Sequence, residues 1–376
     1  PEELKENHRI VNHSGFQGFQ EVIRYDGLRD EEIKVTKVVA ADPLSIGGGA
    51  GAIRNHLESW ESRIRYYSCY IYDQGIVPGM PYRVVDGDLV PDDWSIPREV
   101  EAQFDEILGK TEERFRASMM DWARLLQCPI PEIRRVAVDI EVRPSVQNRM
   151  PSADQARDPI ICVAFAGSDG LRRVVLLNDS GLDVETLEIE GADEVKVYDS
   201  EREIIYETFR IIEEYPVVLT FNGDDFDLKY LRNRARNLGI PDDDIPITLG
   251  RRFAYITNGV HIDLYQFFRN RSIQGYAFGN VYREFSLDKI TVGILGEGKI
   301  QVGDLSQLPM AELGEYCMQD AYITYRLTSF NNNLVMNLMV MLQRISKTIL
   351  EDTSRLGVSR WILSMMRWIH RQKGWL

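Results

Sequence analysis

Residues 135–142 read Arg-Val-Ala-Val-Asp-Ile-Glu-Val, and this stretch decides the fold. Its apolar residues are mostly β-branched and occupy both faces, which predicts a strand buried within a sheet. Because side chains alternate along a strand, Asp139 and Glu141 lie on the same face. An Asp-x-Glu pair alone is usually structural or solvated, so a functional interpretation needs partners elsewhere in the chain.

A second acidic motif follows another apolar stretch. Residues 216–221 read Pro-Val-Val-Leu-Thr-Phe and predict a buried strand, and the Asn-Gly-Asp-Asp of residues 222–225 predicts a turn. Residues 226–238 have helical spacing of apolar side chains, and Gly239 suits the C-cap of that helix. Asp227 should therefore lie in the first helical turn, at the mouth of the sheet.

A third motif lies on a helix predicted for residues 310–327. Tyr316 and Asp320 are four residues apart, so they point to the same place. A phenol beside a metal-ligating carboxylate can orient an attacking water. Hydrolysis of a phosphodiester by two metals needs a carboxylate cluster, and Mg²⁺ prefers hard oxygen ligands. Four carboxylates could together hold two divalent ions: Asp139, Glu141, Asp227 and Asp320.

The order and contexts of these motifs resemble the amino-terminal half of an archaeal-type family B DNA polymerase, including its 3′–5′ proofreading exonuclease domain. Residues 73–80, 261–265 and 295–299 agree with the same family. The resemblance implies two Mg²⁺ (or Mn²⁺) ions bound by the four acids. The resemblance implies substrate-binding roles for Asn222 and Phe226. It implies catalytic roles for five residues: Asp139, Glu141, Asp227, Tyr316 and Asp320.

The expected fold class is α/β, with a ribonuclease H-like exonuclease domain on a mixed sheet and an α+β N-terminal domain. Further strands are predicted at residues 160–167 and 172–178, a helix at 200–214, and a charged helical stretch at 99–126. The expected domains are an N-terminal domain, an exonuclease domain and a helical return that leads toward a palm domain, at residues 1–130, 131–330 and 331–376.

The acidic motifs of the family's polymerase half are not found in this sequence. No Asp-x-x-Ser-Leu-Tyr-Pro-Ser and no Tyr-Gly-Asp-Thr-Asp occurs, so we expect a fragment of a longer polymerase that does not polymerise DNA alone. The expected partners are DNA, as a single-stranded 3′ end or a primer-template, and the palm, fingers and thumb domains. A sliding clamp is a further candidate. Two alternatives stay open: a non-catalytic template-binding scaffold and an RNA-trimming nuclease of the same superfamily.

Composition is compatible with this interpretation. The net charge of −14 over 376 residues argues against a general nucleic-acid coat, but metals can neutralise part of an acidic site. Four scattered cysteines without a Cys-x-x-Cys indicate neither zinc nor a disulfide framework and fit a reducing cytoplasm. No apolar run approaches the length of a membrane-spanning helix, so no membrane association is expected.

Two further features allow more than one interpretation. The stretch 355–373 is basic and interleaved with tryptophans. We interpret it as a helix that packs its tryptophans, and a surface that follows a DNA backbone is the alternative. We interpret His261 as a hydrogen-bonded residue, and a metal ligand or a base is the alternative.

Overall fold

A computed structural model describes residues 2–92, 94–145, 150–178, 187–300, 302–303 and 308–375. The contacts divide the chain into two compact units. The larger one is called the nuclease unit below, and the smaller one is called the N-terminal unit. The nuclease unit consists of Gln127–Leu342 and Ile349–Val358, and the N-terminal unit of Pro1–Leu126, Gln343–Thr348 and Ser359–Leu376.

The nuclease unit is built on a six-stranded mixed sheet with the strand order β12-β9-β5-β6-β7-β8. Strands β12, β9 and β5 are parallel, β5, β6 and β7 are successively antiparallel, and β7 and β8 are parallel. The predicted mixed sheet is therefore confirmed. The strands are β5 Arg135–Val142, β6 Ile160–Gly167, β7 Arg172–Leu177, β8 Glu194–Tyr198, β9 Val217–Thr220 and β12 Val260–Asp263.

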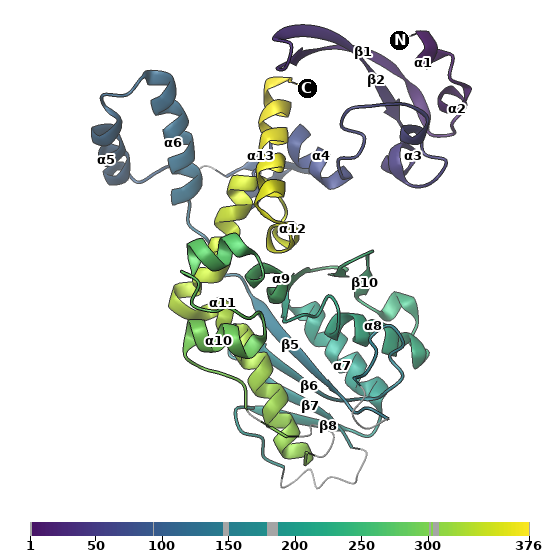
Figure 1. Cartoon of the computed structure of the whole chain (residues 1–376), viewed down its shortest axis with the longest axis vertical. Helices are drawn as coiled ribbons and strands as arrows, with labels where there is room; N and C mark the ends of the chain where they lie inside the picture. The colour runs from purple at the N-terminus through teal and green to yellow at the C-terminus, as the bar shows by residue number, and fades with distance from the viewer. Residues whose placement is uncertain are drawn as a thin grey trace. The chain divides into compact units, whose positions relative to one another are not determined.

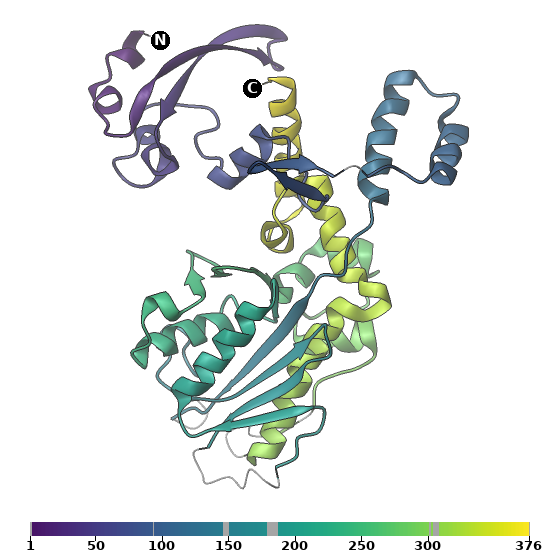
Figure 2. The same cartoon turned by 180° about the vertical axis from the view of Figure 1, so that it is seen from behind.

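Helices cover both faces of this sheet, as Figures 1 and 2 show from opposite sides. Helices α7 (Glu201–Glu214) and α8 (Asp227–Asn237) pack on one face, and α11 (Met310–Ser346) runs along the other. Between them, every residue of β6 is buried, whereas the residues of the edge strand β8 are partly exposed. Shorter elements complete the unit: the hairpin β10 Ile247–Leu249 and β11 Ala254–Ile256, η3 Asp242–Asp244, α9 Leu264–Phe268, η4 Ile273–Ala277, α10 Leu287–Leu295 and α12 Leu350–Arg355.

Two strands and one long helix differ from the sequence prediction. The prediction did not include β8 and β12, because β8 carries charged residues and β12 is only four residues long. The helix predicted to end at residue 327 continues to Ser346, and non-helical backbone angles at residues 330–333 interrupt it. Asn331, Asn332 and Asn333 all adopt positive φ there, a conformation that asparagine tolerates better than most residues.

The N-terminal unit combines hairpins and helices around its own small core. A long antiparallel hairpin joins β1 to β2, and a short one joins β3 to β4. Its elements are α1 Glu2–Lys5, α2 His8–Val11, β1 Phe16–Asp26, β2 Glu31–Ala40, α3 Pro43–Gly47, η1 Ile53–His56, α4 Tyr66–Asp73, β3 Tyr82–Val85, β4 Asp88–Pro91, α5 Arg98–Leu108, α6 Glu113–Gln127 and α13 Val358–Lys373. The charged helical stretch predicted at 99–126 is thus two helices, which separate after Gly109.

Tryptophans of the basic C-terminal stretch pack within the N-terminal unit. Trp361 is buried, and Trp368 Nε1 donates a hydrogen bond of 3.0 Å to the carbonyl of Ile76. On the same helix, Ser364 Oγ lies 2.8 Å from the hydroxyl of Tyr72. These contacts agree with the packing interpretation of residues 355–373.

Within the described parts of the chain, none of the helices combines the length and the apolar content that a bilayer crossing requires.

Candidate metal centre

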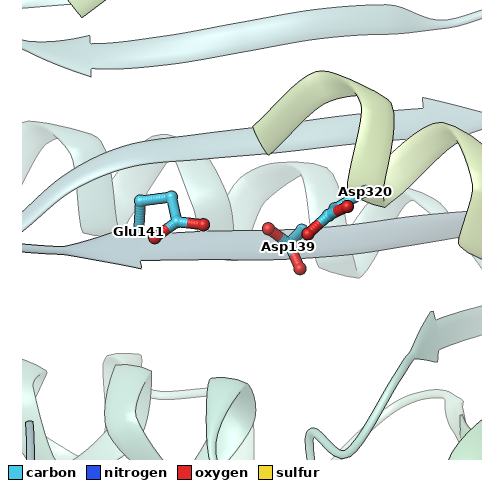
Figure 3. Close-up of side chains that lie close together, drawn as sticks. All are labelled: Asp139, Glu141 and Asp320. Atoms are coloured by element: carbon cyan, nitrogen blue, oxygen red, sulfur yellow. The ribbon is translucent and has the colours of Figure 1, made fainter. Parts of the chain in front are cut away.

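Three of the predicted carboxylates converge in the nuclease unit. Asp139 and Glu141 project from β5, and Asp320 projects from α11, which crosses that face of the sheet. One ligand oxygen from each residue lies within 4.8 Å of the other two. Figure 3 shows Asp320 reaching from its helix toward Asp139, while Glu141 stands further along the strand. The alternation of the strand and the packing of α11 together create the cluster.

The carboxylates of this cluster are difficult to ionise together. Burial, followed by repulsion from the neighbouring Asp320, raises the pKa of Glu141 to about 8. Burial also raises the pKa of Asp139 well above its ordinary value, followed by repulsion from Asp320, Asp227 and Glu141. The pKa of Asp320 is raised by burial, although Lys299 opposes this shift. Crowded anions of this kind favour a bound cation.

Asp227 lies beside the three converging acids but outside the group whose oxygens lie within 4.8 Å of one another. It is the first residue of α8 and is buried. Burial raises its pKa to about 7, while hydrogen bonds from its own backbone N–H and that of Ile140 oppose the rise. Its charge raises the pKa of both Asp139 and Glu141, so it belongs to the same electrostatic cluster.

Lys299 contacts both Asp320 and Tyr316. Lys299 Nζ lies 2.5 Å from Asp320 Oδ2 and 4.9 Å from the centroid of the Tyr316 ring. Tyr316 is 9% exposed, and burial raises the pKa of its phenol to about 12, so the hydroxyl stays protonated. The backbone N–H of Lys299 donates to Asp288 Oδ1 at 3.1 Å. Tyr316 therefore holds its hydroxyl near the carboxylates, where it can orient a small molecule.

Lys299 was not among the residues predicted from the sequence. It ends the stretch 295–299 that agrees with the polymerase family, which was the available signal. Its ion pair with Asp320 joins residues 21 positions apart, and no local periodicity brings them together. Only the tertiary structure brings these two side chains into contact.

The residues present fit a divalent cation. All the donors are carboxylate oxygens, which Mg²⁺ and Mn²⁺ prefer over nitrogen or sulfur. Among the described residues, Asp320 Oδ1 is buried and has no hydrogen-bond partner. A buried carboxylate oxygen without a partner is costly, and a metal ion in the cluster would satisfy it. The same ion would reduce the repulsion that raises the pKa values of the cluster.

The predicted substrate-binding residues lie on the turn that leads to Asp227. Asn222 has a left-handed backbone with φ of 71°, and its N–H donates to Asp263 Oδ1 at 2.8 Å. Phe226 is partly exposed, and its ring centroid lies 5.5 Å from that of Tyr230. In the sequence, both residues shortly precede Asp227. Asp263, which supports this turn, was not recognised as a functional residue in the sequence.

His261 has the environment of a core residue. It is fully buried, its Nε2 lies 2.8 Å from Thr220 Oγ1, and its Nδ1 lies 3.0 Å from the carbonyl of Ala254. Burial lowers its pKa to about 3, and the nearby Arg355 contributes to that shift. The imidazole is therefore neutral and hydrogen-bonded, in agreement with the structural interpretation.

Known proteins resemble this chain in sequence and in architecture. It is 38% identical over 379 residues to DNA polymerase 1 of Saccharolobus solfataricus, which covers 100% of this chain and 42% of the relative. It is 36% identical over 386 residues to DNA polymerase 1 of Aeropyrum pernix, with coverage of 100% and 40%. The chain thus spans less than half the length of these relatives.

A solved structure of the family B DNA polymerase from the hyperthermophilic archaeon Pyrobaculum calidifontis superposes with a TM-score of 0.65. That match covers 97% of this chain and 43% of the other at 18% identity, so it supports the fold alone. Residues 57–281 match the family described as DNA polymerase family B, exonuclease domain. Because this match includes more than half of the chain, the protein belongs to the family B DNA polymerases, through their exonuclease domain.

Proposed function

We propose that this protein is a metal-dependent 3′–5′ DNA exonuclease that removes the 3′-terminal nucleotide of DNA as the proofreading part of a polymerase. The observation that carries the proposal is the meeting of Asp139, Glu141 and Asp320 within 4.8 Å, in a chain that belongs to this family. Their raised pKa values and the unpartnered Asp320 Oδ1 indicate a site made for cations.

Each residue has a role that follows from its position. Two Mg²⁺ or Mn²⁺ ions held by Asp139, Glu141, Asp227 and Asp320 would activate a water and stabilise the charge on the scissile phosphate. Tyr316 keeps its proton near neutral pH and orients the attacking water through its hydroxyl. Asn222 and Phe226 contact the terminal nucleotide, Phe226 through its partly exposed ring.

The substrate follows from the site and the family. The proposed substrate is a single-stranded 3′ end of DNA, supplied by a primer-template. The proposed partners are the palm, fingers and thumb domains of a longer polymerase and a sliding clamp, acting in the cytoplasm. The domain assignment is likewise a proposal, with an N-terminal domain, an exonuclease domain and a helical return at residues 1–130, 131–330 and 331–376.

The test uses the full chain with Mg²⁺ and an oligonucleotide labelled at its 5′ end. Wild-type protein should shorten single-stranded DNA stepwise from the 3′ end, and Asp139→Ala should abolish this. Asp243→Ala is the matched control, because Asp243 is an exposed aspartate on η3. Asp139→Ala protein that digests DNA at the wild-type rate contradicts the mechanism.

The same assay separates the alternatives. An RNA oligonucleotide of the same sequence, degraded faster than the DNA, would indicate an RNA-trimming nuclease. Wild-type protein that binds a primer-template but digests neither oligonucleotide, with Mg²⁺ or with Mn²⁺, would indicate a non-catalytic template-binding scaffold.

A further inference from the structure

A charged cluster is buried behind the turn that leads to Asp227. Its centre is the ion pair between Arg355, the last residue of α12, and Asp224, in the second acidic motif. Both side chains are 1% exposed, and Arg355 Nη2 lies 3.0 Å from Asp224 Oδ1. The partners are 131 positions apart and both belong to the nuclease unit.

Arg355 also fixes the elements around this ion pair. Its Nη2 donates to the carbonyl of Ala254 at 2.6 Å and lies 2.9 Å from Nδ1 of His261. The guanidinium carbon lies 4.8 Å from the ring centroid of Phe253 and 4.9 Å from that of Tyr255. Buried guanidinium groups stacked on aromatic rings and paired with a carboxylate hold their neighbours in one geometry.

Asp224 forms hydrogen bonds through both its side chain and its backbone. Its Oδ1 accepts a hydrogen bond of 2.8 Å from the backbone N–H of Ala254 as well as the one from Arg355. Its own N–H donates to Asp263 Oδ2 at 3.1 Å. The other oxygen of Asp263 accepts from the N–H groups of Asn222, at 2.8 Å, and Tyr265, at 3.0 Å.

The turn needs such support because its backbone is unusual. Asn222 has a φ of 71°, and Phe226, immediately before Asp227, has φ and ψ of −127° and −81°. Such conformations persist when the surrounding structure determines them. Within the turn, the N–H of Phe226 donates to the carbonyl of Asn222 at 3.0 Å, and the N–H of Leu228 donates to the carbonyl of Gly223 at 3.1 Å. These hydrogen bonds connect the residues that flank Asp224 to the first turn of α8, which begins at Asp227.

We propose that Arg355 is a positioning residue for the nuclease reaction: it clamps Asp224 and thereby holds Asp227 beside the carboxylates of β5 and α11. This inference rests on the proposed function, because it assigns a purpose to the position of Asp227. Arg355 touches none of the converging acids itself. Its effect on metal binding and turnover passes through the turn of residues 222–227.

The test compares Arg355→Gln with Arg234→Gln in the full chain. Arg234 on α8 pairs with Glu201 at 2.6 Å, with side chains 13% and 10% exposed, so it offers a similar buried ion pair in the same unit. Four quantities are measured: Mn²⁺ affinity by calorimetry, amide hydrogen exchange of residues 217–228 in EDTA, and kcat and KM on single-stranded DNA.

Arg355→Gln should weaken Mn²⁺ binding and lower kcat by about 10–100-fold, the usual effect of losing a group that orients metal ligands. Exchange of the 217–228 segment should accelerate, and KM should stay within about twofold because the DNA contacts remain. Arg234→Gln should leave Mn²⁺ affinity and kcat near the wild-type values. The inference is overturned if Arg355→Gln keeps its Mn²⁺ affinity and exchange protection, or if Arg234→Gln loses as much.

A second variant covers the case in which Arg355→Gln does not fold. Arg355→Gln combined with Asp224→Asn removes both charges of the ion pair, yet Gln is too short to reach all the partners of Arg355. This protein should fold and still bind Mn²⁺ at least about tenfold more weakly. Wild-type Mn²⁺ affinity in the double variant overturns the inference.

If wild-type protein binds Mn²⁺ but digests no DNA, the proposed function fails, and the affinity and exchange measurements still decide the role of Arg355.

Discussion

Replacing Asp139 by asparagine should stabilise the metal-free protein, although it destroys a central residue of the site. One oxygen each of Asp139, Glu141 and Asp320 lies within 4.8 Å of the other two, and EDTA removes any metal ion that would offset their repulsion. Two unit charges at that distance repel by about 3–4 kcal/mol at an effective dielectric constant of about 20. Lys299 and partial protonation reduce this cost, so we expect Asp139→Asn to raise the free energy of unfolding by about 1–3 kcal/mol at pH 8.

The pH dependence of this gain has a definite sign. The folded pKa of Glu141 is about 8 against an ordinary value of 4.5, so the folded protein binds more protons than the unfolded chain between these values. The stability that protonation of Glu141 contributes is fully present below pH 4.5 and is lost as pH rises through 8. The advantage of Asp139→Asn should therefore be largest near pH 8 and should shrink as the pH falls toward 5.

Thermal melts with and without Mg²⁺ provide the measurement. For a unit of this size, each kcal/mol shifts Tm by about 2–4 °C, so Asp139→Asn should melt a few degrees above wild type in EDTA. Saturating Mg²⁺ should reverse the order, since an ion at about 100 times its Kd adds about 2.7 kcal/mol to the protein that binds it. The reasoning is refuted if the variant melts below wild type in EDTA at pH 8.

Two further predictions concern the third and second motifs. Tyr316→Phe should lower the single-turnover excision rate by about 10²–10³-fold with little change in Mn²⁺ affinity, whereas Tyr316→Ala should also lower the free energy of unfolding by about 3–5 kcal/mol. An unchanged excision rate in Tyr316→Phe would reduce the ring to a packing role. Gly223→Ala would place a Cβ 2.2 Å from Thr220 Oγ1 and 2.5 Å from Thr220 Cβ, so it should cost about 1–3 kcal/mol in a denaturant titration. Wild-type stability in Gly223→Ala would show that Thr220 moves freely, and Thr220→Ala in the same chain should restore part of any loss.

The sequence determined those parts of the site whose geometry is local. The alternation of β5 places Asp139 and Glu141 on one face, and helical spacing sets Tyr316 and Asp320 four residues apart. The change from apolar run to turn to helix likewise locates Asp227 at the start of α8. In each case neighbouring residues fix the geometry through the backbone, so periodicity and turn residues are sufficient evidence.

The tertiary structure alone decided which distant groups meet. Lys299 pairs with Asp320 across a loop, and Arg355 reaches Asp224 from a position 131 residues further along the chain. In the sequence, Arg355 is only the first cation of a basic stretch, and Asp224 is one acid of a turn. Burial explains why they pair: a guanidinium and a carboxylate that are each 1% exposed are stable only in contact with opposite charge and hydrogen-bond partners. No local pattern encodes that requirement, because it arises when α12 packs against the turn.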